Sequence, residues 1–436
     1  MSTFHQIFSK TMLICICIGF ASGMPMYVLI QMIPTWLRDH QIDLQTIGLF
    51  AFASIPYVWK FLWAPFLDIP ITKMGRRKIW TILTQLALSL CLLLLAYLHP
   101  QEHIEWIAGI SVGIAFFSAS QDIVLDAYRR EILTDAELGL GNSVFVNAYR
   151  LSSIIPGSIG LLIADTYNWY WAHVVVAGTM IVIVCLNFWL PEPSVPIENK
   201  PFSFTNTLWL PLQDFWQRNG AQQTLVILAF MFFYKVGDSM ATALSTPFYM
   251  DLGFSKSDLA YTVKAASLWS SIVGGFIGGA IMLKIGIRKA LWYFGWVQLL
   301  TILGFAVLAY DSSVLALRST YTSLNFLSST EMVQAFSIPI NHSLLFVVVS
   351  AEYLGIGLGT AAFVAFIAQK TNPTYTATQF ALLTSISGLP KTITASSAGY
   401  CITYMGYVYF FLFCTTLAIP GLLLLFCMKE ESTEIT

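Results

Sequence analysis

The sequence has few charged residues, and this scarcity excludes most soluble folds. Lysine, arginine, aspartate and glutamate make up 10% of the 436 residues, whereas an ordinary soluble domain has about 25%. Hydrophobic residues make up 57%. They gather into runs of about 20 residues, the length at which a helix crosses a bilayer. The chain therefore belongs in a lipid bilayer.

The chain also lacks an excess of either charge. Its 22 basic and 23 acidic residues give a formal net charge of -1, which excludes a basic nucleic-acid binder and an acidic solvated tail. The seven cysteines form no C-x-x-C pair and have no zinc-site spacing, so we interpret them as small apolar packing residues. His99 and His103 flank Pro100 in a short turn, and we expect no metal there.

Catalytic and nucleotide-binding motifs are absent as well. The sequence contains no G-x-x-x-x-G-K-[ST] loop, which disfavours direct use of ATP. It contains no nucleophile elbow and no H-E-x-x-H helix, which disfavours an embedded hydrolase. We expect neither an enzyme nor a bound cofactor.

Twelve apolar segments of helical length follow one another along the chain. They cover approximately residues 11–34, 45–66, 79–98, 104–127, 140–163, 170–190, 222–248, 258–283, 289–309, 343–369, 377–399 and 405–428. Strands of a membrane barrel would instead show about ten residues of alternating polarity. The first segment exceeds the apolar core of a secretory signal, about 7–15 residues, so we expect it to be retained. The predicted fold is an all-α membrane protein with twelve transmembrane helices.

Lysine and arginine residues favour one side of these segments. Fourteen lie on one side: Lys10, Lys73, Arg76, Arg77, Lys78, Arg129, Arg130, Lys200, Arg218, Lys284, Arg288, Lys289, Lys370 and Lys429. The opposite side has three, Arg38, Lys256 and Arg318. Because cytoplasmic loops carry the basic excess, we predict that both termini are cytoplasmic.

The two halves of the chain resemble each other. Pro34 and Pro247 lie 213 residues apart, and Gly75 and Gly286 lie 211 apart, which favours a duplicated six-helix unit. We predict halves at 1–190 and 222–436, joined by a proline-rich cytoplasmic linker at 191–221. Parallel repeats of this kind hold the solute path between the halves, near the membrane midplane.

Ionisable residues inside the apolar segments mark a candidate path. They are Lys60, Asp122, Asp126, Arg150, Lys235, Asp238, Lys264, Glu352 and Lys391. Each would cost about 2.5–3.5 kcal/mol at the centre of a lipid-facing helix. The sum exceeds a typical folding stability of about 5–15 kcal/mol, so most of them must face a polar interior, a partner charge or a membrane boundary.

These residues have different local alternatives. Asp122 and Asp126 are one helical turn apart, and two close carboxylates favour retention of a proton, so either is a candidate for proton coupling. Asp126 is also placed to pair with Arg129 or Arg130, and Asp122 to contact the solute. Lys235 and Asp238 are placed to neutralise each other, and Lys60 to extend toward the cytoplasm.

Arg150, Lys264, Glu352 and Lys391 have no partner in their own segments, so they are the better candidates for a solute cavity. With five cations against four carboxylates, the set has a small positive excess that suits an anionic solute.

The loop D-I-P-I-T-K-M-G-R-R-K at residues 68–78 is a candidate gate. Its acid, glycine and basic cluster, Asp68, Gly75, Arg76 and Arg77, are suited to cross-link neighbouring helix ends in one transport state. Gly286, Arg288 and Lys289 repeat part of the pattern in the second half. The alternative is that the loop serves only to fix the topology.

Longer strings show a family resemblance. The chain resembles the AmpG-type muropeptide permeases of the major facilitator superfamily in I-G-L-F-A-F-A-S-I-P-Y-V-W-K-F-L-W-A-P-F-L-D (47–68), S-A-S-Q-D-I-V-L-D-A-Y-R-R-E-I-L (118–133), Y-K-V-G-D-S-M-A-T-A-L-S-T-P-F (234–248), L-G-T-A-A-F-V-A-F (358–366) and Y-T-A-T-Q-F-A-L-L-T-S (375–385). The match covers nearly the whole chain. It departs at Ile69, where the superfamily loop has arginine, and at the polar segment 310–342.

The resemblance implies a proton-driven importer of anhydromuropeptides in the bacterial inner membrane. It implies functional roles for eight positions: Lys60, Gln121, Asp122, Asp126, Arg150, Lys235, Asp238 and Glu352. The implied partners are a small polar solute, protons and the lipid bilayer, and we expect a monomer. The same broader family resembles importers of siderophores and transporters of acetyl-CoA, which are alternatives, as is a receptor or scaffold without transport.

Overall fold

The fold is described from a computed structural model, which places residues 9–68, 75–133, 138–192, 209–325, 342–371 and 376–428. These ranges consist of helices and short connections and contain no β-strand. The predicted all-α fold is confirmed.

The first group of helices follows the first six predicted segments. Its elements are α2 (Lys10–Tyr27), η1 (Val28–Met32), α3 (Ile33–Asp39), α4 (Leu44–Leu49), η2 (Phe50–Ser54), α5 (Ile55–Trp59), η3 (Lys60–Leu62), η4 (Ala64–Asp68), α6 (Arg76–Ala96), α7 (Ile104–Ile132), α8 (Leu138–Ser152), η5 (Ile155–Ile159), α9 (Gly160–Thr166) and α10 (Trp169–Asn187).

The second group follows the last six predicted segments. Its elements are α11 (Leu210–Ala243), α12 (Ser245–Asp251), α13 (Lys256–Asp258), η7 (Leu259–Val263), α14 (Lys264–Ile285), α15 (Ile287–Asn325), α17 (His342–Lys370) and α18 (Thr376–Cys427). Gly220 interrupts α11 with a φ of +72°, and Gly406 interrupts α18 with a φ of +75°.

The helices account for the twelve predicted segments. In the described ranges, nine helices are long and apolar enough to cross a membrane. One of them, Leu383–Cys427, has the length for two crossings, which meet at the Gly406 kink. Two further crossings are broken locally: 44–68 contains several 3-10 turns, and 138–166 contains the π-helical turn η5.

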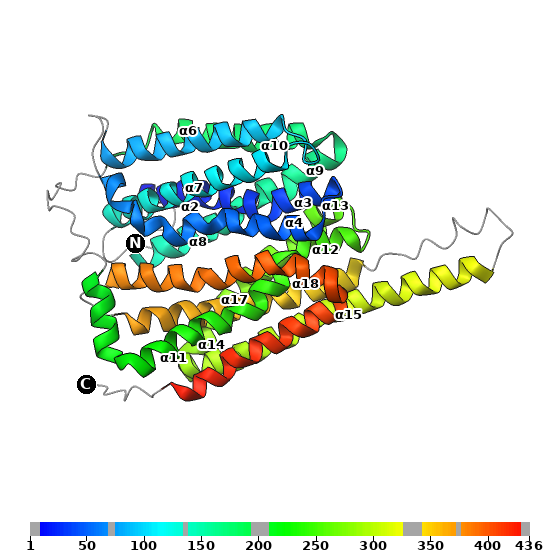
Figure 1. Cartoon of the computed structure of the whole chain (residues 1–436). Coiled ribbons are helices and arrows are strands. Elements are labelled where there is room, and N and C mark those ends of the chain that lie inside the picture. The colour runs from blue at the N-terminus through cyan, green and yellow to red at the C-terminus, as the bar shows by residue number, and fades with distance from the viewer. Residues whose placement is uncertain are drawn as a thin grey trace.

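Two predicted boundaries need comment. Segment 289–309 was expected to end before a polar loop, but α15 continues to Asn325 and extends past the neighbouring helices in Figure 1. Residues 310–325 contain no glycine or proline to end the helix. The rest of the 310–342 segment, 326–341, and most of the predicted linker, 193–208, lie outside the described residues.

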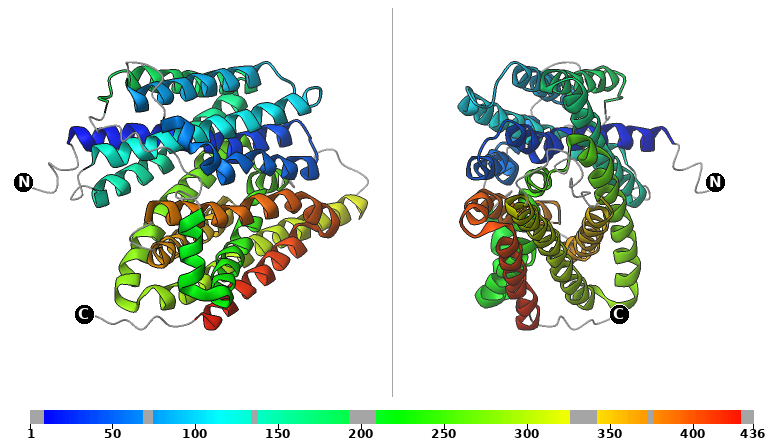
Figure 2. Two further views of the ribbon diagram at one scale, coloured as in Figure 1. Left: turned by 60° about the vertical axis from the view of Figure 1, so that its left-hand side comes forward. Right: turned by 90° about the vertical axis from the view of Figure 1, so that its right-hand side faces the viewer.

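The two groups form two layers that lie against each other (Figures 1 and 2). α2 begins and α18 ends on the same side of the molecule (Figure 1), as an even number of crossings requires. The layers approach closely where α4 meets α18, because a Cβ on Gly399 would overlap the backbone of Leu44. The division at residues 190 and 222 remains a proposal.

Capping residues start the helices that follow the connecting turns. Asp43 accepts a hydrogen bond from the Thr46 amide at 2.8 Å and begins α4. That hydrogen bond lowers the pKa of the Asp43 carboxyl. Ser255 and Asp258 form a capping box at α13. In each group of helices, the capped turn connects the first membrane crossing to the second. The two turns lie on the same side of the molecule.

Candidate transport site

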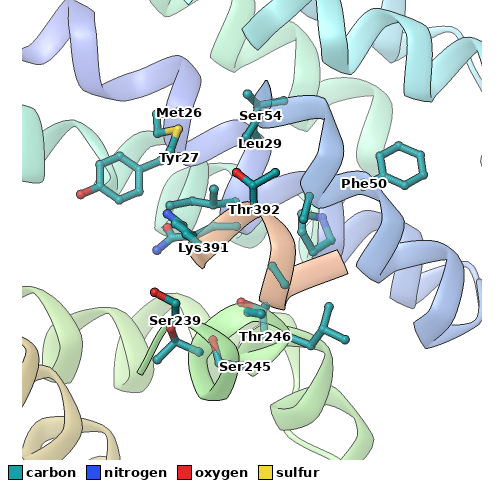
Figure 3. A pocket seen from close by; sticks show the side chains of 18 of the residues that line it. Met26, Tyr27, Leu29, Phe50, Ser54, Ser239, Ser245, Thr246, Lys391 and Thr392 are labelled. Atoms are coloured by element: carbon teal, nitrogen blue, oxygen red, sulfur yellow. The ribbon is translucent and has the colours of Figure 1, made fainter. Parts of the chain in front are cut away.

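A cavity of about 580 Å³ lies between the two groups of helices. The first group contributes residues from 26–34, 47–60, 157 and 161, and the second contributes residues from 239–249, 259–267, 353–356 and 384–395. Figure 3 shows side chains from α2, α11, α12 and α18 converging on this space. The volume is within the usual range of small-molecule sites, about 300–1,000 Å³.

Three π-helical turns meet at the cavity. η1 supplies Leu29, Ile30 and Gln31, η5 supplies Gly157, and η7 supplies Leu259 and Val263. A π-turn inserts one residue into a helix and redirects the side chains that follow. Pro34 comes just after η1 and Pro156 lies in η5, and proline lacks the amide hydrogen that a regular α-helix would need at these positions. The local sequence thus sets the backbone irregularities that shape the site.

Three lysines line the cavity, and none of its lining residues is an aspartate or glutamate. Lys264 is buried, and its Nζ donates to Gln31 Oε1 at 3.0 Å and lies 5.1 Å from the centre of the Tyr27 ring. Lys391 is exposed toward the cavity, and Figure 3 shows it among the side chains that line this space. Lys60 is half-buried. These three are the predicted cavity residues that the structure brings to the lining.

The predicted acidic pair of the first half lies on α7, outside the lining. Asp122 is half-buried, and its Oδ1 accepts a hydrogen bond from Ser22 of α2 at 2.5 Å. Asp126 is exposed and pairs with Arg129 at 2.9 Å. Gln121 is fully buried, and neither of its amide atoms has a hydrogen-bond partner among the described residues. The two carboxylates therefore differ in environment, and Asp122 is the one without an ion pair in the described structure.

A second polar cluster lies inside the second group. Lys235 pairs with Asp238 at 3.1 Å, the local pairing anticipated as an alternative, and Gln298 donates to Asp238 Oδ2 at 3.1 Å. Glu352 is fully buried, and its two carboxylate oxygens have no hydrogen-bond partner among the described residues. The cluster is not part of the cavity lining, so solute contact by these side chains remains a prediction.

Arg150 joins the two groups away from the lining. Its Nη1 donates to the carbonyl of Ser271 on α14 at 3.2 Å. A second contact across the same interface runs from Ser158 Oγ to the carbonyl of Ala260, at 2.8 Å. Arg150 thus lies at the boundary between the halves, and a direct solute contact by it also remains a prediction.

One end of the molecule, which we call the Asp251 end, is held closed by charges. Arg38 Nε lies 2.5 Å from Asp251 Oδ1, and Lys256 Nζ lies 3.0 Å from Asp39 Oδ2. Tyr407 also donates to Asp251 at 2.5 Å. Within the described ranges, every ion pair that joins the two groups lies at this end.

Aromatic rings fill the space near these ion pairs. Phe248 of α12 packs against Phe411 and Tyr407 of α18, with ring centres 4.9 and 4.7 Å apart. In the first group, Trp36 packs against His173 with ring centres 4.5 Å apart. Each of these stacks lies within one group, and the ion pairs Arg38–Asp251 and Lys256–Asp39 are what join the two groups at the Asp251 end.

The opposite end, which we call the Arg77 end, has contacts within each group. Glu192 accepts from the backbone amides of Arg77 and Lys78, at 2.9 and 3.0 Å, and so caps α6. Arg77 pairs with Glu131 of α7 at 2.7 Å. Gly75 has a φ of +101°, and the Glu192 side chain occupies the space of a Cβ on it.

The predicted gate residues are divided between described and undescribed parts. The side chains of Asp68 and Arg76 and all of residues 69–74 lie outside the described part. In the second half, Gly286 has a φ of +80° before α15, and Arg288 donates to the carbonyls of Leu425 and Met428 at 2.9 and 3.0 Å. Lys289 is exposed. A gating role for these residues remains a prediction.

Several residues that form the ion pairs and the helix cap at the two ends were not predicted from the sequence. Glu131 and Glu192 follow the predicted segments 104–127 and 170–190, and nothing in the sequence pattern marks them. The repeat does mark Arg38 and Asp251, because they are 213 residues apart, the same offset as Pro34 and Pro247. Equivalent residues of two repeats meet where they lie near the axis that relates the repeats.

Comparison with known proteins establishes the family. Residues 15–368 match the Major Facilitator Superfamily. The Escherichia coli (strain K12) anhydromuropeptide permease is 32% identical over 96% of this chain and 79% of its own length. The chain is an AmpG-type member of the major facilitator superfamily. It is a multi-pass membrane transporter and not an enzyme.

Two other proteins extend the comparison. A Haemophilus influenzae protein, named only as uncharacterized, is 46% identical to this AmpG-type chain over 98% of the chain and 97% of its own length. The crystal structure of the nucleoside transporter NupG has a TM-score of 0.70 at 12% identity, covering 97% of this chain and 100% of that one. The latter likeness concerns the fold alone, which is the predicted major facilitator fold.

Proposed function

We propose that this chain is a proton-coupled importer of anhydromuropeptides in the bacterial inner membrane. The observation that carries the proposal is the 32% identity to an anhydromuropeptide permease over 96% of the chain. A cavity between two helical groups, closed at the Asp251 end, supports a transport mechanism by alternating access.

Basic residues favour placing the Arg77 end in the cytoplasm. Arg77, Lys78, Arg129, Lys284 and Lys289 all lie at that end or on the helix turns that lead to it. With this orientation the Asp251 end faces the periplasm, and the closed ion pairs there describe an inward-facing state. Import then requires these pairs to separate so that the solute can enter from outside.

Asp122 is the residue to which we assign proton coupling. It lies in the membrane-spanning part of α7, and its one described hydrogen bond comes from the neutral Ser22 hydroxyl. Asp126 already has the cation Arg129 beside it, and a carboxylate paired with a permanent cation holds its charge more firmly than an unpaired one. Asp122 is therefore the better proton carrier, and Asp126 contributes to the local charge balance.

Uptake by liposomes that contain only this purified protein tests the function. With an imposed pH gradient, acidic outside, labelled anhydromuropeptide is expected to accumulate, and an uncoupler is expected to abolish accumulation. Asp122→Asn should lose gradient-driven accumulation, while Asp126→Asn should keep part of it. A ferric siderophore serves as the control solute, and its accumulation in place of the muropeptide would refute the proposed substrate.

A further inference from the structure

We propose that Trp169 and Tyr407 are positioning residues for the closure of the Asp251 end. Trp169 donates to Asp39 and Tyr407 donates to Asp251, and each fixes its aspartate where that carboxylate binds a cation of the other group of helices. The inference rests on the alternating access in the proposed function, but it requires neither a particular solute nor proton coupling.

The ends of α3 and α12 have the same backbone structure. Gln41 and Gly253 follow these helices with a positive φ, +60° and +91°, and each donates its amide to the carbonyl three residues earlier. A residue of this kind is a common way to end a helix. Gln41 and Gly253 are 212 residues apart, as are Asp39 and Asp251. The two aspartates therefore occupy matching positions in the two groups.

Asp251 has two donors, which reach its two oxygens separately. Arg38 of the first group lies 2.5 Å from Oδ1, and Tyr407 of its own group donates to Oδ2 at 2.5 Å. The side-chain freedom that is lost when an exposed ion pair forms opposes the pairing. Tyr407 keeps Oδ1 turned toward Arg38, so less freedom is lost when this pair forms.

Asp39 has the same kind of environment. Lys256 of the second group donates to its Oδ2 at 3.0 Å, and the indole nitrogen of Trp169, in its own group, donates to the same oxygen at 2.6 Å. The Lys256 ammonium also lies 5.7 Å from the centre of the Trp169 ring, within the range of a cation–π contact. Trp169 therefore contacts both members of this ion pair.

Trp169 and Tyr407 also occupy matching places in the two groups. Trp169 is the first residue of α10, and Tyr407 is the first residue after the Gly406 kink in α18. Each therefore begins the last membrane crossing of its group and reaches the end of the first crossing. The structure thus contains two similar assemblies, each with one aspartate, one cation of the other group and one aromatic donor.

The two assemblies differ in one acid. Asp165 of the first group lies 4.0 Å from Lys256 and gives this lysine a second acidic partner. Among the residues that the structure describes, Arg38 forms an ion pair with Asp251 alone. We therefore expect loss of the Tyr407 hydroxyl to weaken closure more than loss of the Trp169 donor.

Thiol labelling from the two sides of the membrane tests the assignment. Thr246→Cys places a thiol in the cavity lining on α12, and a membrane-impermeant reagent is applied from either side without solute or a pH gradient. Asp251→Asn removes the Arg38 ion pair and should raise labelling from the Asp251 side by at most about fivefold. Tyr407→Phe weakens that pair and should raise labelling about twofold to fourfold. Neither should raise labelling from the opposite side.

Combined substitutions show whether each aromatic residue acts through its aspartate. Trp169→Phe alone should raise labelling from the Asp251 side about twofold. Tyr407→Phe should add little in the Asp251→Asn background, and Trp169→Phe should add little in the Asp39→Asn background, because the carboxylate that each one positions is already absent.

The matched controls are Tyr404→Phe and Trp171→Phe, on the same two helices, with residues that are 92% and 50% exposed. Both should label as the parent does. Parent-like labelling of Tyr407→Phe or of Trp169→Phe would overturn the role of that residue. Full additivity in the aspartate backgrounds, or faster labelling from both sides, would refute positioning and indicate a general loosening of the fold. The assay contains no solute, so its outcome is independent of the uptake assay that decides the proposed function.

Discussion

Reversing the charge of Arg38 should open the Asp251 end. Arg38 and Asp251 are 27% and 18% exposed, so their pair contributes at most about 1 kcal/mol to the closed state. Arg38→Glu removes that contribution and adds a repulsion of similar size. The closed state then loses about 2 kcal/mol, which corresponds to about a 30-fold rise in the ratio of open to closed molecules.

Thiol labelling of a cavity position measures this change. Thr246 lines the cavity on α12, the helix that ends at Asp251. In a Thr246→Cys background, a membrane-impermeant thiol reagent is applied from the Asp251 side, and labelling at position 246 is quantified by peptide mass spectrometry. Arg38→Glu should raise the initial labelling rate by about 30-fold if closed molecules predominate in the parent protein.

Exchange of the two charges is the control. The double variant Arg38→Glu with Asp251→Arg restores an ion pair across the same interface and should return the labelling rate toward that of the parent. Unchanged labelling in the single variant would refute the role of this pair in closing the cavity. Equal labelling of the single and double variants would show that the ion pair between positions 38 and 251 does not determine the labelling rate.

Two further predictions concern packing and charge elsewhere. Gly157→Ala would place a Cβ against Gln31 Oε1 and 3.0 Å from Lys264 Nζ, so we expect uptake to fall at least tenfold. Gly178→Ala is the control, because no atom lies near its Cβ position, and it should not change uptake. Equal uptake by both variants would show that the packing around Gly157 does not matter for transport. Arg77→Gln removes a largely buried ion pair with Glu131 and should lower the free energy of unfolding by about 3 kcal/mol, read as a lower thermal midpoint. The double variant with Glu131→Gln should recover part of that loss, and a double variant less stable than Arg77→Gln would argue against the pairing.

Much of the fold could be predicted from the sequence because a bilayer imposes a simple length rule on apolar segments. The rule correctly located segments such as 104–127, which corresponds to α7. It also located segments whose helices are interrupted, although it gave no indication of the interruptions. The π-turns η1, η5 and η7 were not predicted. A π-turn changes the backbone over a few residues without changing the apolar character of the segment, so hydrophobicity gives no sign of it.

The candidate site was predicted only in part. Sequence alone selected Lys60, Lys264 and Lys391 because ionisable residues inside apolar segments need a polar environment, and all three line the cavity. The same rule could not tell these lysines from Lys235, whose charge is compensated by Asp238. Whether a lysine lines the cavity depends on which face its helix presents to the other group of helices. Packing between segments that are far apart in the sequence determines that face.

Simultaneous measurement of solute and proton movement shows directly whether this transporter couples the two. Liposomes containing only this protein are loaded with a pH-sensitive dye, and anhydromuropeptide is added outside without an imposed gradient. If protons enter with the solute, solute entry acidifies the interior, and Asp122→Asn abolishes the acidification. Muropeptide accumulation with no proton entry in the wild type, or undiminished acidification in Asp122→Asn, would contradict this coupling.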